Sequence, residues 1–179
     1  MAYDLTMAAV ATGDGISAAM WNILVNNIDY LHDTREQLSV GPISNTSMST
    51  TGDFHAPSTN NVNNATHTGF QVFIPANFGA LVSAVVLMLA TTTYSAEADF
   101  NTDFGGVGEN YNANSGNMLN QAVSFTANQI KSVDIASILT GLAAGDMLGL
   151  RVSNSSGANA GNWQALQLVI VYTRSDSIP

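Results

Sequence analysis

Residues 81–93 read LVSAVVLMLATTT, a stretch rich in β-branched side chains and free of proline and glycine. Successive side chains of a β-strand point to opposite faces, and here both faces are apolar. One face would carry Leu81, Val85, Leu87 and Leu89, and the other Val82, Ala84, Val86, Met88 and Ala90. The stretch therefore predicts a central strand whose two faces are both covered.

Shorter strand-like runs, separated by turn residues, follow one another from Gly69 onward. They are residues 70–74, 97–104, 123–125, 130–135, 147–152 and 165–173. The only other segment that fits a short helix is DIASILTGLAAG, residues 134–145. Several short strands at this spacing predict a mainly β domain over 69–179, an antiparallel β-sandwich.

The last predicted strand is also apolar on both faces. Leu166, Leu168, Ile170 and Tyr172 alternate there with Ala165, Val169 and Val171. A two-layer sandwich covers only one face of each sheet, so a helix, a connecting segment or a neighbouring subunit must cover the other. The candidate residues for a subunit interface are Val82, Val86, Met88, Val169 and Val171.

The N-terminal part divides into an irregular arm, residues 1–15, and a predicted helix over residues 16–38 that contains no glycine or proline. Ser17 is a plausible N-cap of this helix. Its apolar residues form a seam that would serve in oligomerisation or attachment, although packing on its own β domain is the alternative. The seam consists of Trp21, Leu24, Ile28, Leu31 and Leu38, and is interrupted once by Arg35.

Residues 39–68 are rich in serine, threonine and asparagine, with Pro42 and Pro57 as breakers. They form either a polar linker or a connection with one or two edge strands around residues 43–54. A wholly irregular loop of this length would be unusual in a compact domain.

Composition limits the classes of partner. Charged residues make up 9% of the chain, against about 25% in an average soluble domain. The net charge is −9, and the four basic residues are scattered. Nucleic acid and an anionic membrane surface are therefore not expected as partners, because binding to phosphates needs a concentrated positive patch. The N-terminus lacks the basic and apolar regions of a signal peptide, and no run is long enough for a membrane helix.

No motif for catalysis, a metal or a cofactor stands out. Residues 99–106, DFNTDFGG, resemble the start of a calcium loop, but Phe104 stands where the turn glycine belongs. The favoured interpretation is therefore an amphipathic strand with Asp99 and Asp103 facing water. The three histidines have no second ligand at the spacing of a metal site, and no nucleophile motif occurs. We therefore expect no enzyme activity and no cofactor.

Several segments together resemble the jelly-roll proteins of phage virions. Residues 16–36, ISAAMWNILVNNIDYLHDTRE, are similar to a short attachment or trimerising helix of such proteins. The stretch GFQVFIPANFGALVSAVVLMLATTT (residues 69–93), VDIASILTGLAAGDMLGLRVS (133–153) and ALQLVIVYTR (165–174) resemble a single jelly roll of the kind found on capsid decoration proteins, head fibres and tail-fibre tips.

This resemblance implies a homotrimer, located in the virion and assembled in the host cytoplasm. Its partner would be the major capsid protein or another virion protein, bound through the arm and the helix. The polar stretch 39–68 is too short for a fibre shaft, which favours a capsid decoration (cement) protein. The alternative is a receptor- or carbohydrate-binding fibre tip, with the loops around Tyr111 and Trp163 as contacts.

Overall fold

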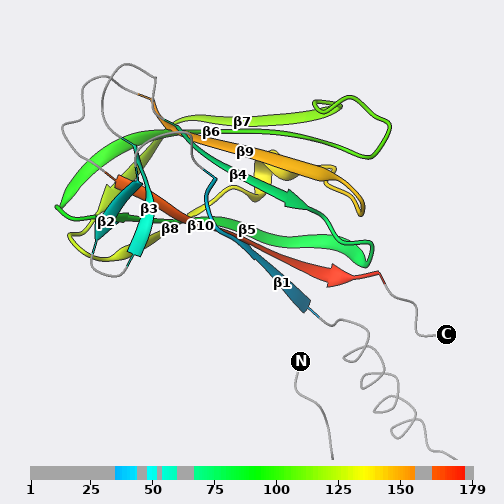
Figure 1. Cartoon of the computed structure of the whole chain (residues 1–179), viewed down its shortest axis with the longest axis horizontal. Helices are drawn as coiled ribbons and strands as arrows, with labels where there is room; N and C mark the ends of the chain where they lie inside the picture. The colour runs from blue at the N-terminus through cyan, green and yellow to red at the C-terminus, as the bar shows by residue number, and fades with distance from the viewer. Residues whose placement is uncertain (1–34, 44–47, 52–53, 60–66, 156–162, 176–179) are drawn as a thin grey trace, which may run out of the picture.

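The computed structural model describes residues 35–43, 48–51, 54–59, 67–155 and 163–175 of the chain. Together these residues form two packed antiparallel sheets (Figure 1). Within this part of the chain the only helix is one short 3-10 turn, η1 (Ala136–Leu139). It lies inside the segment in which the sequence allows a short helix, and the mainly β prediction is confirmed.

The first sheet has six strands. Its order is β2-β3-β10-β5-β8, and β1 pairs with β10 beyond the end of β3. The strands are β1 (Arg35–Val40), β2 (Met48–Thr51), β3 (Phe54–Thr59), β5 (Phe78–Ala90), β8 (Ile130–Asp134) and β10 (Trp163–Arg174).

The second sheet has four strands in the order β4-β9-β6-β7. They are β4 (His67–Phe73), β6 (Tyr94–Gly105), β7 (Asn114–Phe125) and β9 (Met147–Asn154). If the β2-β3 hairpin is set aside, β1-β10-β5-β8 faces β4-β9-β6-β7. Among these eight strands, taken in chain order without β2 and β3, the chain changes sheet at every connection except the β6-β7 hairpin. This is the strand order of an eight-stranded jelly roll.

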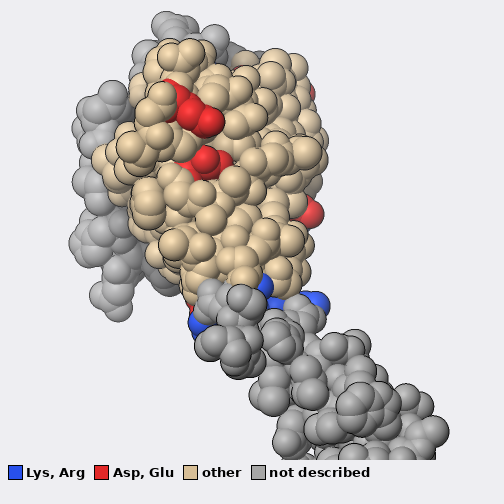
Figure 2. Space-filling view, turned by 90° about the vertical axis from the view of Figure 1, so that its right-hand side faces the viewer, with Lys and Arg blue, Asp and Glu red and all other residues tan. Residues whose placement is uncertain are grey.

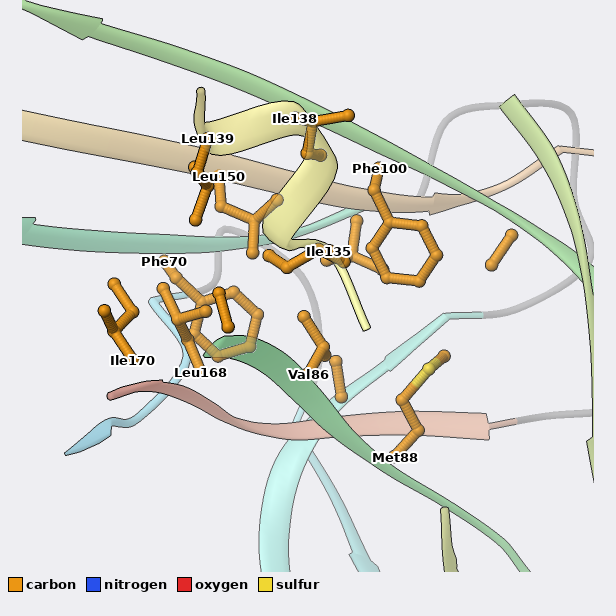
Figure 3. Close-up of a cluster of buried hydrophobic side chains, with 14 of the residues drawn as sticks. Phe70, Val86, Met88, Phe100, Ile135, Ile138, Leu139, Leu150, Leu168 and Ile170 are labelled. Atoms are coloured by element: carbon orange, nitrogen blue, oxygen red, sulfur yellow. The ribbon is translucent and has the colours of Figure 1, made fainter. Parts of the chain in front are cut away.

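The core lies between the sheets and is built from alternate residues of the long strands (Figure 3). Trp163 is completely buried and stacks on Phe125 at a ring distance of 6.3 Å. At the other end of the sandwich Phe78 stacks on Tyr172 at 5.1 Å. Phe125 on β7 and Trp163 on β10 therefore join the two sheets at one end, whereas Phe78 and Tyr172 join neighbouring strands of the first sheet at the other.

The short helix η1 closes one side of the core over β6 and β7. Thr102 donates a hydrogen bond from Oγ1 to the carbonyl of Ile138 at 3.0 Å, so this buried hydroxyl is satisfied. A Cβ on Gly116 would lie 2.9 Å from the Cβ of Ile138. Only glycine therefore lets β7 approach η1 this closely.

For two of the five residues predicted to lie in a subunit interface, the prediction is wrong. Val86 and Met88 are fully buried in the core of their own subunit, together with Ala84 and Ala90. Val82 does not share their face. The pairing with β10 skips it, because Val171 pairs with Ser83 and Tyr172 with Leu81, and this bulge turns Val82 outward. Strand alternation holds only between such bulges.

The prediction is also wrong for the last four residues of the expected helix. Residues 35–38 belong to β1, where exposed and half-buried residues alternate and where Leu38 packs against the core. Pairing with β10 along six residues overrides the helix-forming tendency of Glu36, Gln37 and Leu38.

The arm over residues 1–15 and the seam residues Trp21, Leu24, Ile28 and Leu31 lie outside the described residues. Among the residues that are described, no helix has the length and apolar character needed to cross a membrane.

Candidate functional site

The outer face of the second sheet carries two rows of residues that run across its four strands. Each row follows from the register. One consists of Gly69, Arg151, Asn101 and Asn117, and the other of Gln71, Gly149, Asp103 and Ser115. The residues before and after them on the same strands, among them Phe70, Leu148 and Leu150, point into the core. Strand alternation therefore places all the polar side chains of both rows on the outside.

These rows form the floor of a groove of about 800 Å³. Small-ligand sites commonly have volumes of about 300–1,000 Å³. Each row contains one glycine, and both glycines lie on the adjacent strands β4 and β9. A Cβ on Gly149 would meet only the carbonyl of Asp103, at 3.7 Å, which is ordinary contact. The packing of the backbone therefore does not require a glycine at position 149. The effect of this glycine is to hollow the floor of the groove.

The loop between β6 and β7 forms one rim of the groove and carries Tyr111. The loop is fixed by backbone hydrogen bonds from Glu109 to Gly106 (3.1 Å) and from Ala113 to Asn110 (3.0 Å). It folds back over the end of β6, where a Cβ on Gly105 would lie 2.6 Å from the carbonyl oxygen of Asn110. These contacts hold Tyr111, which is 79% exposed, beside the groove.

The groove contains few and opposing charges. Arg151 and Asp103 lie on its floor, and among the described residues the only ion pair is the one between Arg174 and Glu36, outside the groove. Figure 2 shows one end of the molecule, on which most of the described surface is neither acidic nor basic. The side chains of Asn101, Asn117 and Gln71 lie on the floor of the groove.

The stretch that resembles a calcium loop is an amphipathic strand, as predicted from the sequence. Phe100 and Phe104 are buried, and Asp99 and Asp103 lie on the outer face of β6. Asp99 accepts a hydrogen bond from the backbone N–H of Asn120 at 2.7 Å. Across the described part of the chain, no group of three or more acidic or histidine side chains could hold a metal ion.

The outer face of the first sheet differs in character. Its centre is an apolar stripe formed by outward residues of β5 and β10, with Val169 paired to Val85. Polar, exposed residues flank the stripe, such as Ser39 on β1 and Asp134 on β8. The stripe consists of Val82, which is 40% exposed, and the half-buried Val85, Leu87, Val169 and Val171.

A polar cluster ties β1 to the end of β10. Tyr172 donates its hydroxyl to Glu36 at 2.7 Å, Asn77 donates to the same carboxylate at 3.3 Å, and Arg174 lies 3.2 Å from it. The hydrogen bond from Tyr172 is the largest of the influences that lower the pKa of Glu36 below its usual value. Burial, followed by the contact with Glu36, raises the pKa of Tyr172.

The residues predicted to form a subunit interface and those predicted to contact a ligand lie in different places. Val82, Val169 and Val171 lie on the apolar stripe, and Tyr111 lies at the groove, whereas Trp163 is fully buried and cannot contact a ligand. Sequence reasoning missed the floor of the groove. The signal that could have located it was a glycine inside each of two strands, Gly69 and Gly149, since such glycines often mark the close approach of a ligand.

Neither a protein-family model nor a curated protein sequence matches this chain. Among solved structures, it is similar to the carbohydrate-binding module CBM36 in complex with calcium and xylotriose, with 13% identity over 76% of this chain and 98% of that one, and a TM-score of 0.40. It is also similar to a chain of infectious bursal disease virus, Gx strain, with 12% identity over 83% of this chain and 34% of that one, and a TM-score of 0.44.

A third similar structure is the coat protein of tobacco streak virus, with 11% identity over 80% of this chain and 90% of that one, and a TM-score of 0.27. The three similar structures thus comprise a carbohydrate-binding module, a chain of a virus and a viral coat protein.

Proposed function

We propose that the protein is a non-enzymatic structural protein of a virion, present as a homotrimer. The observation that carries this proposal is the contrast between the outer faces of the two sheets. The first presents the apolar stripe, and the second presents a polar groove. An apolar face next to solvent favours association with another protein surface, whereas a polar groove with a fixed rim suits recognition of a ligand.

The finer proposal is a capsid decoration protein. In it, residues 1–34 bind the major capsid protein or another virion protein, and the jelly roll projects from the shell. Three copies would bind equivalent sites together, so that their combined affinity exceeds that of a single contact. Within this proposal Trp21, Leu24, Ile28 and Leu31 remain the predicted attachment residues.

The second candidate is a receptor- or carbohydrate-binding tip of a phage fibre. The groove favours it, because a protein that only covers a shell needs no hollowed polar floor with an aromatic side chain on a fixed loop at its rim. Both candidates are homotrimers. They differ in whether the outer face of the second sheet binds a ligand.

The trimer can be tested by sedimentation of the purified full chain at micromolar concentration. We expect a trimer for the natural sequence. Val169→Lys, which places a charge in the middle of the apolar stripe, should give a folded monomer, because an unpaired charge is costly to bury in an interface. Val107→Lys is the matched control, since Val107 is 96% exposed in the β6-β7 loop. That variant should remain trimeric.

Two results would contradict this assignment. If the natural chain sediments as a monomer, the trimer is wrong. If Val169→Lys remains a trimer that dissociates only when residues 1–34 are removed, the association belongs to that segment and the apolar stripe has no part in it. A particle reconstruction would then distinguish the shell from the fibre tip.

A further inference from the structure

The groove on the second sheet has the chemistry of a binding site for a neutral oligosaccharide. We infer that it binds an uncharged, hydroxyl-rich glycan chain across β4, β9, β6 and β7. This inference deepens the second candidate function and rests on it, but it requires neither a trimer nor the apolar stripe.

The floor matches the hydrogen-bonding needs of sugar hydroxyls. Each hydroxyl both donates and accepts, and an Asn or Gln amide also offers both roles from one side chain. Asn101, Asn117 and Gln71 supply three such amides, and Ser115 adds a hydroxyl. They come from three of the four strands, which fixes their positions on a rigid sheet and lowers the entropy lost on binding.

The size of the floor favours an oligomer over a single sugar. Neighbouring strands lie about 4.8 Å apart, so the three steps from β4 to β7 span about 14 Å. The two rows are two residues apart along each strand, or about 7 Å. A chain lying across the strands could therefore contact both rows over several units.

Tyr111 supplies an aromatic surface at one end of this floor. Its side chain is largely exposed, while the backbone of its loop is fixed by the contacts at Gly105 and Gly106. An exposed aromatic ring on a fixed loop can cover the apolar face of a sugar ring at little entropic cost.

Charge decides between the classes of ligand. The floor carries one positive side chain, Arg151, and one negative side chain, Asp103, and the chain as a whole has a net charge of −9. A nucleic acid or a polyanionic glycan would be repelled, because binding to anions needs a surplus of positive charge. A peptide strand that extends a sheet would bind at a sheet edge, whereas this groove lies on a sheet face.

The same residues favour binding without cleavage. Asp103 is the only carboxylate among the described residues that line the groove. Glycoside hydrolysis by the usual mechanism takes two carboxyl groups, one on each side of the bond that breaks.

The test is an array of bacterial surface glycans, both neutral and uronate-containing, probed with the full chain and followed by calorimetry on the strongest binder. We expect binding to at least one neutral glycan. Gly149→Leu, which fills the hollow in the floor, should weaken this binding by about tenfold or more. Tyr111→Ala should weaken it by about threefold to tenfold, the range expected for one aromatic contact.

Ala122→Leu is the matched control for added bulk. Ala122 is exposed on β7 and does not line the groove, so its substitution should leave the affinity within about twofold. The melting temperature of each variant verifies that the domain is folded.

Three results would overturn the inference. They are the absence of binding to any neutral glycan, preferential binding to uronate-containing glycans, and equal affinity of Gly149→Leu and the natural chain. Because sedimentation tests the trimer separately, a trimer that binds no glycan would refute this inference and leave the virion structural role standing.

Discussion

Gly116 shows how one residue without a side chain sets the distance between β7 and η1. Replacing it with alanine would drive a Cβ against Ile138, both its carbonyl and its Cβ. We expect Gly116→Ala to lower the free energy of unfolding by about 1–3 kcal/mol, the usual cost of overpacking. Thermal or urea unfolding would measure the loss.

Gly149→Ala is the control for this prediction. It adds the same methyl group to a strand of the same sheet, at a site where the nearest atom is 3.7 Å away. Its stability should stay close to that of the natural chain. Equal losses in the two variants would show that the contact with Ile138 has no special role.

Glu36 gives the molecule a dependence on pH at the junction of β1 and β10. Its contacts lower the pKa of the carboxyl group below the ordinary value of 4.5 in the folded protein. The ionised form is therefore the one that the fold favours. This contribution to stability is complete above about pH 4.5, and it is lost as the pH falls through the folded pKa.

Glu36→Gln removes the charge and retains the shape. The variant should melt at a lower temperature than the natural chain at pH 7, because Tyr172 and Arg174 lose a charged partner. The difference in melting temperature should shrink as the pH is lowered below about 4.5. A gap that is constant from pH 7 to pH 3 would rule out the carboxylate as its source.

At the scale of elements, β1 is where a helix was expected and a strand is found. Leu38 is half-buried against the core, and its neighbour Gln37 is exposed. Leu38→Ala should therefore lower the free energy of unfolding by about 1–2 kcal/mol, less than for a fully buried leucine.

Gln37→Ala should change the stability by no more than about 0.5 kcal/mol, as is usual for a surface position. Both values can be obtained from urea titrations of the purified variants. Since a helix would not alternate with a period of two, similar effects at the two positions would contradict the strand.

The strands inside the sandwich could be predicted from the sequence, because long runs such as 81–93 carry their own apolar pattern. Each of the seven runs predicted from residue 70 onward overlaps a strand, although the run 81–93 extends past the end of β5 at Ala90. Two features could not be predicted. The six residues of β1 show no clear periodicity of apolar residues. They form a strand because they pair with β10, which is distant in the sequence. The bulges at Val82 and Leu166 decide which residues face the core, and nothing local marks them.

At the scale of the whole molecule, the start of β1 defines where the jelly roll begins. Removing residues 1–34 should leave the sandwich folded with a nearly unchanged melting temperature, and should abolish binding to the particle. Removing residues 1–38 should also destabilise the domain, because it takes away the contacts of Glu36 and Leu38. Calorimetry and co-sedimentation with particles would measure the two effects.

If the shorter deletion still binds particles, attachment does not depend on the N-terminal segment. If the two deletions melt at the same temperature, β1 contributes nothing to the stability of the sandwich.

The class of fold was predictable from the sequence, but the groove was not. A β-sandwich follows from the number and spacing of the strands. The groove depends on which residues of four strands share a row, and Asn101 on its own reads as an ordinary surface residue. Only the register brings it beside Arg151 and Asn117.

The pairing of β1 with β10 also places the first and last described strands of the jelly roll side by side. Arg35 lies opposite Thr173, and opposite residues of an antiparallel pair are about 4.5–5.5 Å apart. A few linking residues could therefore join the two ends. The chain could then be opened in the turn at residues 91–93, at the far end of β5. Such a circular permutant would keep the jelly roll and present a fused cargo from the opposite end of the domain.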